Sequence, residues 1–207
     1  MPPKAKITKE MILHTALQIT RETGFEAVNA RRIAGKLQCS TRPIFTCYQN
    51  MDELKRGFLA FAYEYYEGYV ARYRGHAPAN PCLLLPLSYI RFAREEPNLF
   101  QLLFINDMDL KMTGPGDFYK EPDNEKRARL FSQATGIGWE RAKVIFLDLF
   151  LYTHGIAVLT ATKKLRLGGE DAEKMVSHFL SAFLGREKPA RQGAPGPDLG
   201  EAGKELK

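Results

Sequence analysis

The most informative segment of the chain runs from residue 29 to residue 48 and reads NARRIAGKLQCSTRPIFTCY. Its first half predicts a short helix over residues 30–37. Asn29 is a favoured N-cap, because its side-chain oxygen can accept a hydrogen bond from a backbone amide of the first turn. Apolar residues then follow at helical spacing, with Ile33 placed to pack against the residue that precedes the cap.

A second short helix is expected after a tight turn at residues 38–39. Ser40 is another capping residue, and the helix would cover residues 41–48. Pro43 is tolerated in its first turn, where backbone amides have no helical acceptor. Two short helices joined by a three-residue turn predict a helix-turn-helix, whose second helix enters the major groove of DNA. We expect Thr41, Arg42 and Thr46 to face solvent on that helix and Ile44 and Tyr48 to face the core.

Longer helices are predicted on both sides of this pair. The helix over residues 7–24 has Thr8 as its N-cap and ends at Gly24, a residue type that often terminates helices. After the pair, Asn50 and Glu53 have the spacing of a capping box. They open a longer helix that is expected to continue to about residue 74.

The rest of the chain is also predicted to be helical. Helices are expected over residues 84–96, 98–110, 123–135, 139–164 and 170–184, with Asn98 as the N-cap of the second of these and a loop over residues 111–122. The last segment, residues 186–207, is rich in Pro, Gly and charge and lacks periodicity, which is typical of a disordered tail. Because no strand pattern is found, the sequence predicts an all-α protein of about nine helices.

Basic residues are concentrated in the first quarter of the chain. The formal net charge is +6, and residues 1–50 hold eight Lys and Arg against three acidic residues. Residues 76–184 hold thirteen residues of each sign. A basic region that carries a predicted helix-turn-helix is typical of a surface that contacts a polyanion, although solvated basic faces are also common.

The order and spacing of these residues resemble the DNA-binding domain of TetR-type repressors. The resemblance covers roughly residues 7–60 and rests on Gly24-Phe25, Ile33-Ala34, Cys39-Ser40-Thr41-Arg42-Pro43-Ile44-Phe45, Tyr48 and Asp52-Glu53-Leu54. The family usually has Gly where this chain has Gln38, and Lys where it has Met51. A non-Gly residue in a left-handed turn costs about 1 kcal/mol. Without the Lys, one phosphate contact would be absent.

The resemblance implies roles for individual residues. Side chains at the start of the second helix would approach base edges, with Arg42 suited to guanine and Phe45 to a thymine methyl group. Asn29 and Lys55 would contact phosphates. Tyr48 would either bind a phosphate or pack in the core. The implied DNA contacts are Asn29, Thr41, Arg42, Pro43, Phe45, Thr46, Tyr48 and Lys55.

The C-terminal part resembles the family more loosely. Residues 89–100 look like the junction of the fifth and sixth helices of many members, and His154-Gly155 is similar to a signature of one sub-group. The resemblance implies a homodimer formed by the last two helices and a pocket for an unidentified small-molecule effector. Candidate pocket residues are Phe61, Tyr65, Phe104, Phe146, Phe150 and His154. Such aromatic residues can equally be core, and both interpretations stay open.

These observations divide the chain into three parts. We expect a helix-turn-helix DNA-binding domain over residues 1–52, a helical effector-binding and dimerisation domain over residues 53–185, and the tail over residues 186–207. The expected function is a ligand-responsive repressor that binds a palindromic DNA operator as a homodimer.

A cytoplasmic protein without a membrane partner is expected. No signal peptide is recognised, and the longest apolar stretch, residues 144–162, contains Asp148 and His154 and falls short of a membrane span. Three cysteines match no zinc motif and four histidines are dispersed, so neither a metal nor another cofactor is expected.

Two alternatives to a DNA-binding regulator stay open. An enzyme could use the apolar pocket, but no Ser/His/Asp string, phosphate loop or metal-ligand cluster supports catalysis, so we expect none. A regulator-like adaptor could have lost specific DNA binding, and Gln38 and Met51 are the features that favour it.

Overall fold

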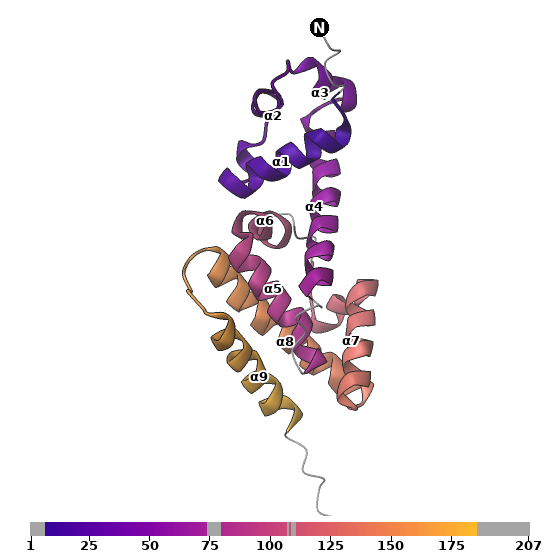
Figure 1. Cartoon of the computed structure of the whole chain (residues 1–207). Helices are drawn as coiled ribbons and strands as arrows, with labels where there is room; N and C mark the ends of the chain where they lie inside the picture. Colours follow the sequence, from indigo (N-terminus) through magenta and orange to yellow (C-terminus); the bar gives the residue numbers. More distant parts are fainter. Residues whose placement is uncertain (1–6, 74–79, 107, 109–110, 186–207) are drawn as a thin grey trace, which may run out of the picture.

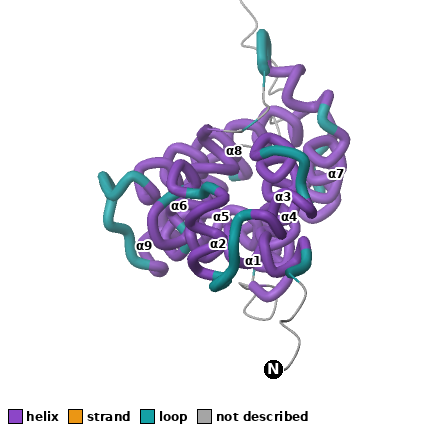
Figure 2. The backbone as a smooth tube through the Cα atoms, turned by 90° about the horizontal axis from the view of Figure 1, so that it is seen from above, coloured by secondary structure: helices purple, strands orange, loops and turns teal. Residues whose placement is uncertain are grey.

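The computed structural model describes residues 7–73, 80–106, 108 and 111–185, which form helices and loops without a strand (Figures 1 and 2). The all-α prediction is confirmed. The α-helices are α1 (Lys9–Thr23), α2 (Ala30–Lys36), α3 (Arg42–Cys47), α4 (Met51–Tyr73), α5 (Leu84–Glu95), α6 (Pro97–Gln101), α7 (Pro122–Thr135), α8 (Trp139–Ala161) and α9 (Gly169–Leu184). Short 3-10 helices cover Phe25–Ala27, Pro81–Leu83 and Pro115–Lys120, and Leu102–Asn106 is π-helical. The predicted disordered tail lies outside the described residues.

Helices α1, α2 and α3 gather at one end of the molecule, and α4 leads from them into a body formed by α5 to α9 (Figure 1). In the body, α5 packs along α8, and α7 and α9 each pack against α8. Helix α6 lies between the two parts, because it contacts α1 on one side and α5 and α8 on the other. The predicted domain boundary at residues 52 and 53 falls at the start of α4.

The predicted caps of α1, α2 and α4 are present. The Thr8 side chain accepts a hydrogen bond from the Met11 amide at 3.2 Å, and the Asn29 Oδ1 accepts one from the Arg32 amide at 2.9 Å. The Glu53 amide donates to the Asn50 side chain at 2.9 Å. Helix α3 differs from the prediction, since its N-cap is Thr41 rather than Ser40 and its first turn is closed by the Thr41 carbonyl.

The α6 region also differs from the prediction. Asn98 does not cap a helix over residues 98–110, because α6 begins at Pro97, with Glu96 as its N-cap. The Asn98 side chain instead donates to the Arg21 carbonyl at 2.9 Å and so ties α6 to α1. After Gln101 the helix widens into the π-helical segment, which pattern reasoning from side-chain spacing did not detect.

The predicted loop over residues 111–122 contains a 3-10 helix, Pro115–Lys120. The Asp117 carboxylate organises it by accepting hydrogen bonds from the amides of Thr113 and Gly114, at 2.7 and 3.1 Å. Lys120 adds an ion pair to the same carboxylate at 2.6 Å. These hydrogen bonds to the charged form hold the pKa of Asp117 well below its usual range.

Helix α8 is, within the described ranges, the one helix long and apolar enough to cross a membrane by length and composition. The apolar stretch over residues 144–162 was predicted to fall short of a membrane span, but the helix begins earlier, at Trp139, and has 23 residues. Core helices of soluble proteins can have the same length and composition. Since α5, α6, α7 and α9 all pack against α8, its apolar side chains are in large part core.

Gln38 adopts the left-handed conformation that the family pattern usually assigns to Gly. Its φ is +52°, and its amide donates to the Gly35 carbonyl at the end of α2 at 3.2 Å. A β-carbon in this conformation clashes with the backbone, so the turn between α2 and α3 carries a small strain.

We expect Gln38→Gly to stabilise the fold by roughly 0.5–1 kcal/mol, because relief of the left-handed strain exceeds the entropy cost of glycine. Urea denaturation of the purified protein measures the difference. The control is Gln18→Gly at an exposed position inside α1, which should destabilise by about 1 kcal/mol. Equal destabilisation by both changes would contradict this account of the turn.

Candidate nucleic-acid interface

Helix α3 presents an exposed face that carries a large apolar side chain between polar ones. Ile44 is fully buried and anchors the helix, whereas Phe45 is 48% exposed. Arg42 and Thr46 are exposed on either side of Phe45, and the Thr46 hydroxyl donates to the Arg42 carbonyl at 3.0 Å. The helix contains no acidic residue. An exposed cation, hydroxyl and aromatic ring on one short helix are suited to base edges and phosphates.

Three arginines near this face are exposed without a partner. Arg42 begins α3, and Arg31 and Arg32 lie in the first turn of α2. Within the described part of the chain, none of the three side chains makes a hydrogen bond or ion pair. By contrast, Lys36 on α2 is paired with Glu22 at 2.8 Å. Unpaired cations at the ends of two neighbouring helices leave a local positive potential that would attract an anionic backbone.

The other candidate DNA contacts have structural partners. Asn29 caps α2, and Lys55 places its ammonium 5.6 Å from the centre of the Phe25 ring. Tyr48 is only 4% exposed, burial raises the pKa of its phenol, and the Lys9 ammonium lies 5.0 Å from its ring centre. The structure thus groups Arg42, Phe45 and Thr46 on the exposed face and places the Tyr48 ring in the core. Thr41 and Pro43 are half-buried at the start of α3.

Arg31 and Arg32 were not among the DNA contacts expected from the sequence. They lie two and three residues after the Asn29 cap, and their exposure at the start of α2 could have been expected from the buried positions of Ala30, Ile33 and Ala34. Met51, which replaces a family Lys, is half-buried and packs against the core.

A buried carboxylate connects this unit to the body of the molecule. Glu96, on the connection between α5 and α6, is 7% exposed. Its Oε2 accepts a hydrogen bond from Arg21 of α1 at 2.7 Å, and its Oε1 accepts one from the Tyr65 hydroxyl of α4 at 3.0 Å. The ion pair with Glu96 raises the pKa of Arg21, and burial raises the pKa of Tyr65. The orientation of α1 is thereby linked to α4 and to the junction of α5 and α6.

Comparison with known proteins identifies the fold. No family model and no curated protein matches the sequence. A TetR-like transcriptional regulator from Rhodococcus sp. RHA1 is similar in structure, with a TM-score of 0.61 over 90% of this chain and 100% of that chain, at 14% sequence identity. The chain has the fold of a TetR-like regulator. The sequence resemblance is confirmed at this level, and function has to be argued from the residues themselves.

In this TetR-like fold the candidate pocket residues divide into two groups. Phe61 and Tyr65 lie where α4 meets the first helices, since Phe61 contacts His14 and Tyr65 contacts Glu96. The others lie in the aromatic interior of the body, a cluster formed by Tyr66, Tyr89, Phe92, Phe100, Phe104, Phe118, Phe131, Phe146, Phe150 and His154.

Aromatic rings pack closely throughout this interior. Phe104 lies 4.9 Å from Tyr66, and Phe150 lies 4.8 Å from Phe118, measured between ring centres. The interior offers ring faces and one imidazole to any ligand that enters it. Among the described residues, no group of three or more His, Cys, Asp or Glu side chains could hold a metal ion.

His154 is the member of this interior whose ordinary pKa lies near neutral pH. Its Nδ1 shares a hydrogen bond of 3.0 Å with the Tyr89 hydroxyl, and its ring stacks on Phe150 at 5.7 Å. Burial lowers the pKa of His154 and raises that of Tyr89 well above its usual range. Both groups are therefore neutral at physiological pH in the folded protein.

We expect the folded state to lose stability as the pH falls from about 7 to about 5. His154 has an ordinary pKa near 6.5 in the unfolded chain and a lower one when folded, so the unfolded chain binds more protons in this interval. Thermal denaturation across this pH range should show a smaller loss for His154→Gln than for wild type. His178→Gln on exposed α9 is the control and should follow the wild type. If His154→Gln lost thermal stability with falling pH as steeply as wild type, His154 would not be the group that causes the loss.

Proposed function

We propose that this chain is a transcriptional regulator that reads DNA with α3. The observation that carries the proposal is the exposed face of α3, where Phe45 lies beside Arg42 and Thr46 without any acidic residue. A phenylalanine that is 48% exposed gains nothing in water, but it can pack against thymine methyl groups or sugars in a groove. Arg42 can donate two hydrogen bonds to a guanine.

The neighbouring residues support the same role. Arg31 and Arg32 would add phosphate contacts, and the proposed set also includes Asn29, Thr41, Pro43 and Lys55, whereas the ring of Tyr48 packs in the core. The TetR-like fold supports transcription regulation, since it presents α2 and α3 at one end of the molecule (Figure 1). We propose a repressor in the cytoplasm that releases its operator when a small molecule enters the aromatic interior.

A homodimer through α8 and α9 is part of this proposal. Helix α8 exposes Val144, Leu151 and Leu159 at 61%, 52% and 44%, with spacings close to two helical turns. Beside it, Tyr152 stacks on Phe179 at 4.8 Å, and Phe179 stacks on Phe183 of α9 at 4.5 Å. Exposed apolar side chains that recur on one helix face form an apolar stripe, here with Asp148 and Gly155 between them, and such a stripe is typical of a surface that a second chain covers. Two copies related by a two-fold axis would read a palindromic operator.

DNA binding is tested by selecting genomic fragments with the purified protein at two salt concentrations. We expect a palindromic site whose affinity falls steeply with salt, because phosphate contacts release counterions. Arg42→Ala should weaken binding to that site by about 1–3 kcal/mol and relax base preference at one position. Phe45→Ala should weaken DNA binding without loss of stability, since the ring is exposed.

The matched control is Lys126→Ala, which removes an exposed cation of α7 far from α3 in Figure 1. It should leave the affinity and its salt dependence unchanged. Weak binding without sequence preference, equal in wild type and Arg42→Ala, would rule out the reading role of α3. That result would favour the adaptor.

The dimer is tested by light scattering on the purified chain. We expect wild type at twice the mass of one chain and Leu151→Asp at the mass of one chain, because a carboxylate in the apolar stripe would be buried unpaired. Leu130→Asp is the control, since Leu130 on α7 is 57% exposed but lies outside the stripe. A wild-type monomer, or a dimer that survives Leu151→Asp, would contradict the proposed interface.

A further inference from the structure

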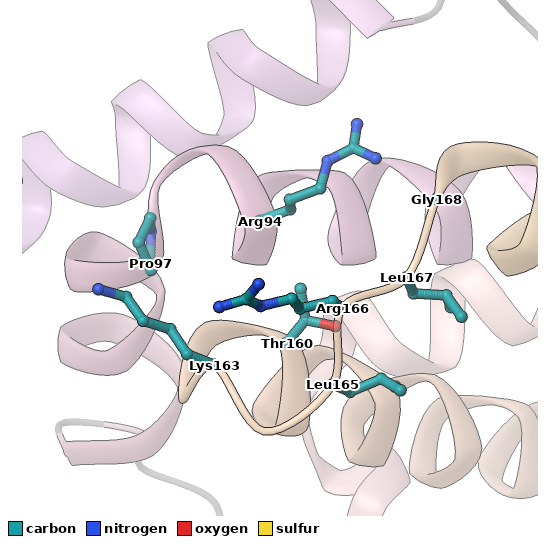
Figure 3. Close-up of a pocket in the computed structure, with 8 residues that line it drawn as sticks. All are labelled: Arg94, Pro97, Thr160, Lys163, Leu165, Arg166, Leu167 and Gly168. Carbon is teal, nitrogen blue, oxygen red and sulfur yellow. The ribbon is translucent and has the colours of Figure 1, made fainter.

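A hollow of about 420 Å³ lies where the α5–α6 junction faces the connection between α8 and α9 (Figure 3). Arg94 and Pro97 form one wall, and Lys163 and Arg166 rise from the other. Leu165 and Leu167 add apolar surface. Figure 3 shows the Lys163 and Arg166 side chains extending in the same direction, toward Pro97, with Arg94 on the facing helix.

No carboxylate lines this hollow. The acid nearest to Arg94 is Glu95, at 3.8 Å, and Glu95 is already held by Arg91 and by the Tyr69 hydroxyl, each at 2.7 Å. Within the described residues, Lys163 and Arg166 have no hydrogen-bond or ion-pair partner through their side chains. Three cations therefore border one space, and among the described residues only Arg94 has a carboxylate within ion-pair distance, Glu95 at 3.8 Å.

Helix ends account for only part of this arrangement. Cations are favoured at helix C-termini, and Lys163 and Arg166 follow the end of α8 while Arg94 lies in the last turn of α5. A cation near a helix C-terminus is equally favourable when its side chain extends into open solvent, as does the exposed Lys164. Helix ends therefore do not require three cations to border one space with an apolar floor, where their mutual repulsion costs free energy.

We propose that this hollow binds a small organic anion. A carboxylate or phosphate group would lie between Lys163 and Arg166, and an apolar body would pack against Pro97, Leu165 and Leu167. The volume fits a ligand of this class, since small-molecule sites typically occupy about 300–1,000 Å³. The site is separate from the aromatic interior of the body, whose named members include neither a lysine nor an arginine.

The position of the hollow gives a bound anion access to the first helices. Pro97 begins α6 and directly follows Glu96, whose carboxylate holds Arg21 of α1 at 2.7 Å. An occupant that contacts Pro97 would bias the placement of α6 and hence of α1. Any effect on DNA binding rests on the proposed function above, whereas anion binding itself does not.

The test is an amide NMR titration of the full chain without DNA. The probes are phenyl phosphate, benzoate, inorganic phosphate and the neutral benzyl alcohol. We expect saturable shifts confined to residues 94–97 and 160–169 with phenyl phosphate or benzoate. The ligand that binds more tightly, phenyl phosphate or benzoate, shows whether the site prefers a phosphate or a carboxylate group. Inorganic phosphate should bind at least tenfold more weakly, because it lacks the apolar body.

Arg166→Gln and Lys163→Gln should each weaken binding about tenfold, as loss of one charged hydrogen bond predicts. Lys164→Gln removes a neighbouring charge that does not line the hollow and should leave the affinity unchanged. Equal binding of benzyl alcohol, equal loss in all three variants, or shifts spread over the surface would overturn the proposal. Because no DNA is present, a protein that fails to bind DNA can still pass this test.

Discussion

The arrangement of the molecule depends on the buried carboxylate of Glu96. A buried charge must be paired, because removal of a carboxylate from water costs several kcal/mol unless hydrogen bonds compensate it. Arg21 of α1 and Tyr65 of α4 provide that compensation at 2.7 and 3.0 Å. Since the backbone of Glu96 connects α5 to α6, this one residue ties α1 and α4 to the α5–α6 junction. The helices that carry the reading face are thereby held in a defined orientation relative to the body.

Local signals in the sequence were sufficient for much of the fold. Thr8, Asn29 and Asn50 were predicted as caps, and each accepts the expected backbone hydrogen bond. Such contacts join residues three positions apart, so a sequence pattern contains all of their information. The start of α6 was predicted wrongly, because Asn98 serves a distant partner, the Arg21 carbonyl. Spacing along one helix cannot reveal a contact between residues 77 positions apart.

The candidate DNA interface was predictable to the same degree. The helical spacing of apolar and polar residues in α3 correctly predicted that Ile44 is buried and that Arg42 and Thr46 are exposed. The contacts of Tyr48 with Lys9 and of Lys55 with Phe25 depend on how α1, α3 and α4 pack, so no local pattern indicated them. Phe61 and Tyr65 lie apart from the remaining pocket candidates, and the sequence did not show this for the same reason. A helical stripe shows which residues share a face, but it does not show which element packs against that face.

We propose that DNA contacts the chain at α3 and the start of α2. Hydrogen–deuterium exchange of the full-length protein, with and without a duplex containing its selected site, tests this proposal. Slower exchange is expected over residues 29–48 in the complex, with little change over residues 139–161. Unchanged exchange over residues 29–48, with protection elsewhere in the chain, would contradict it.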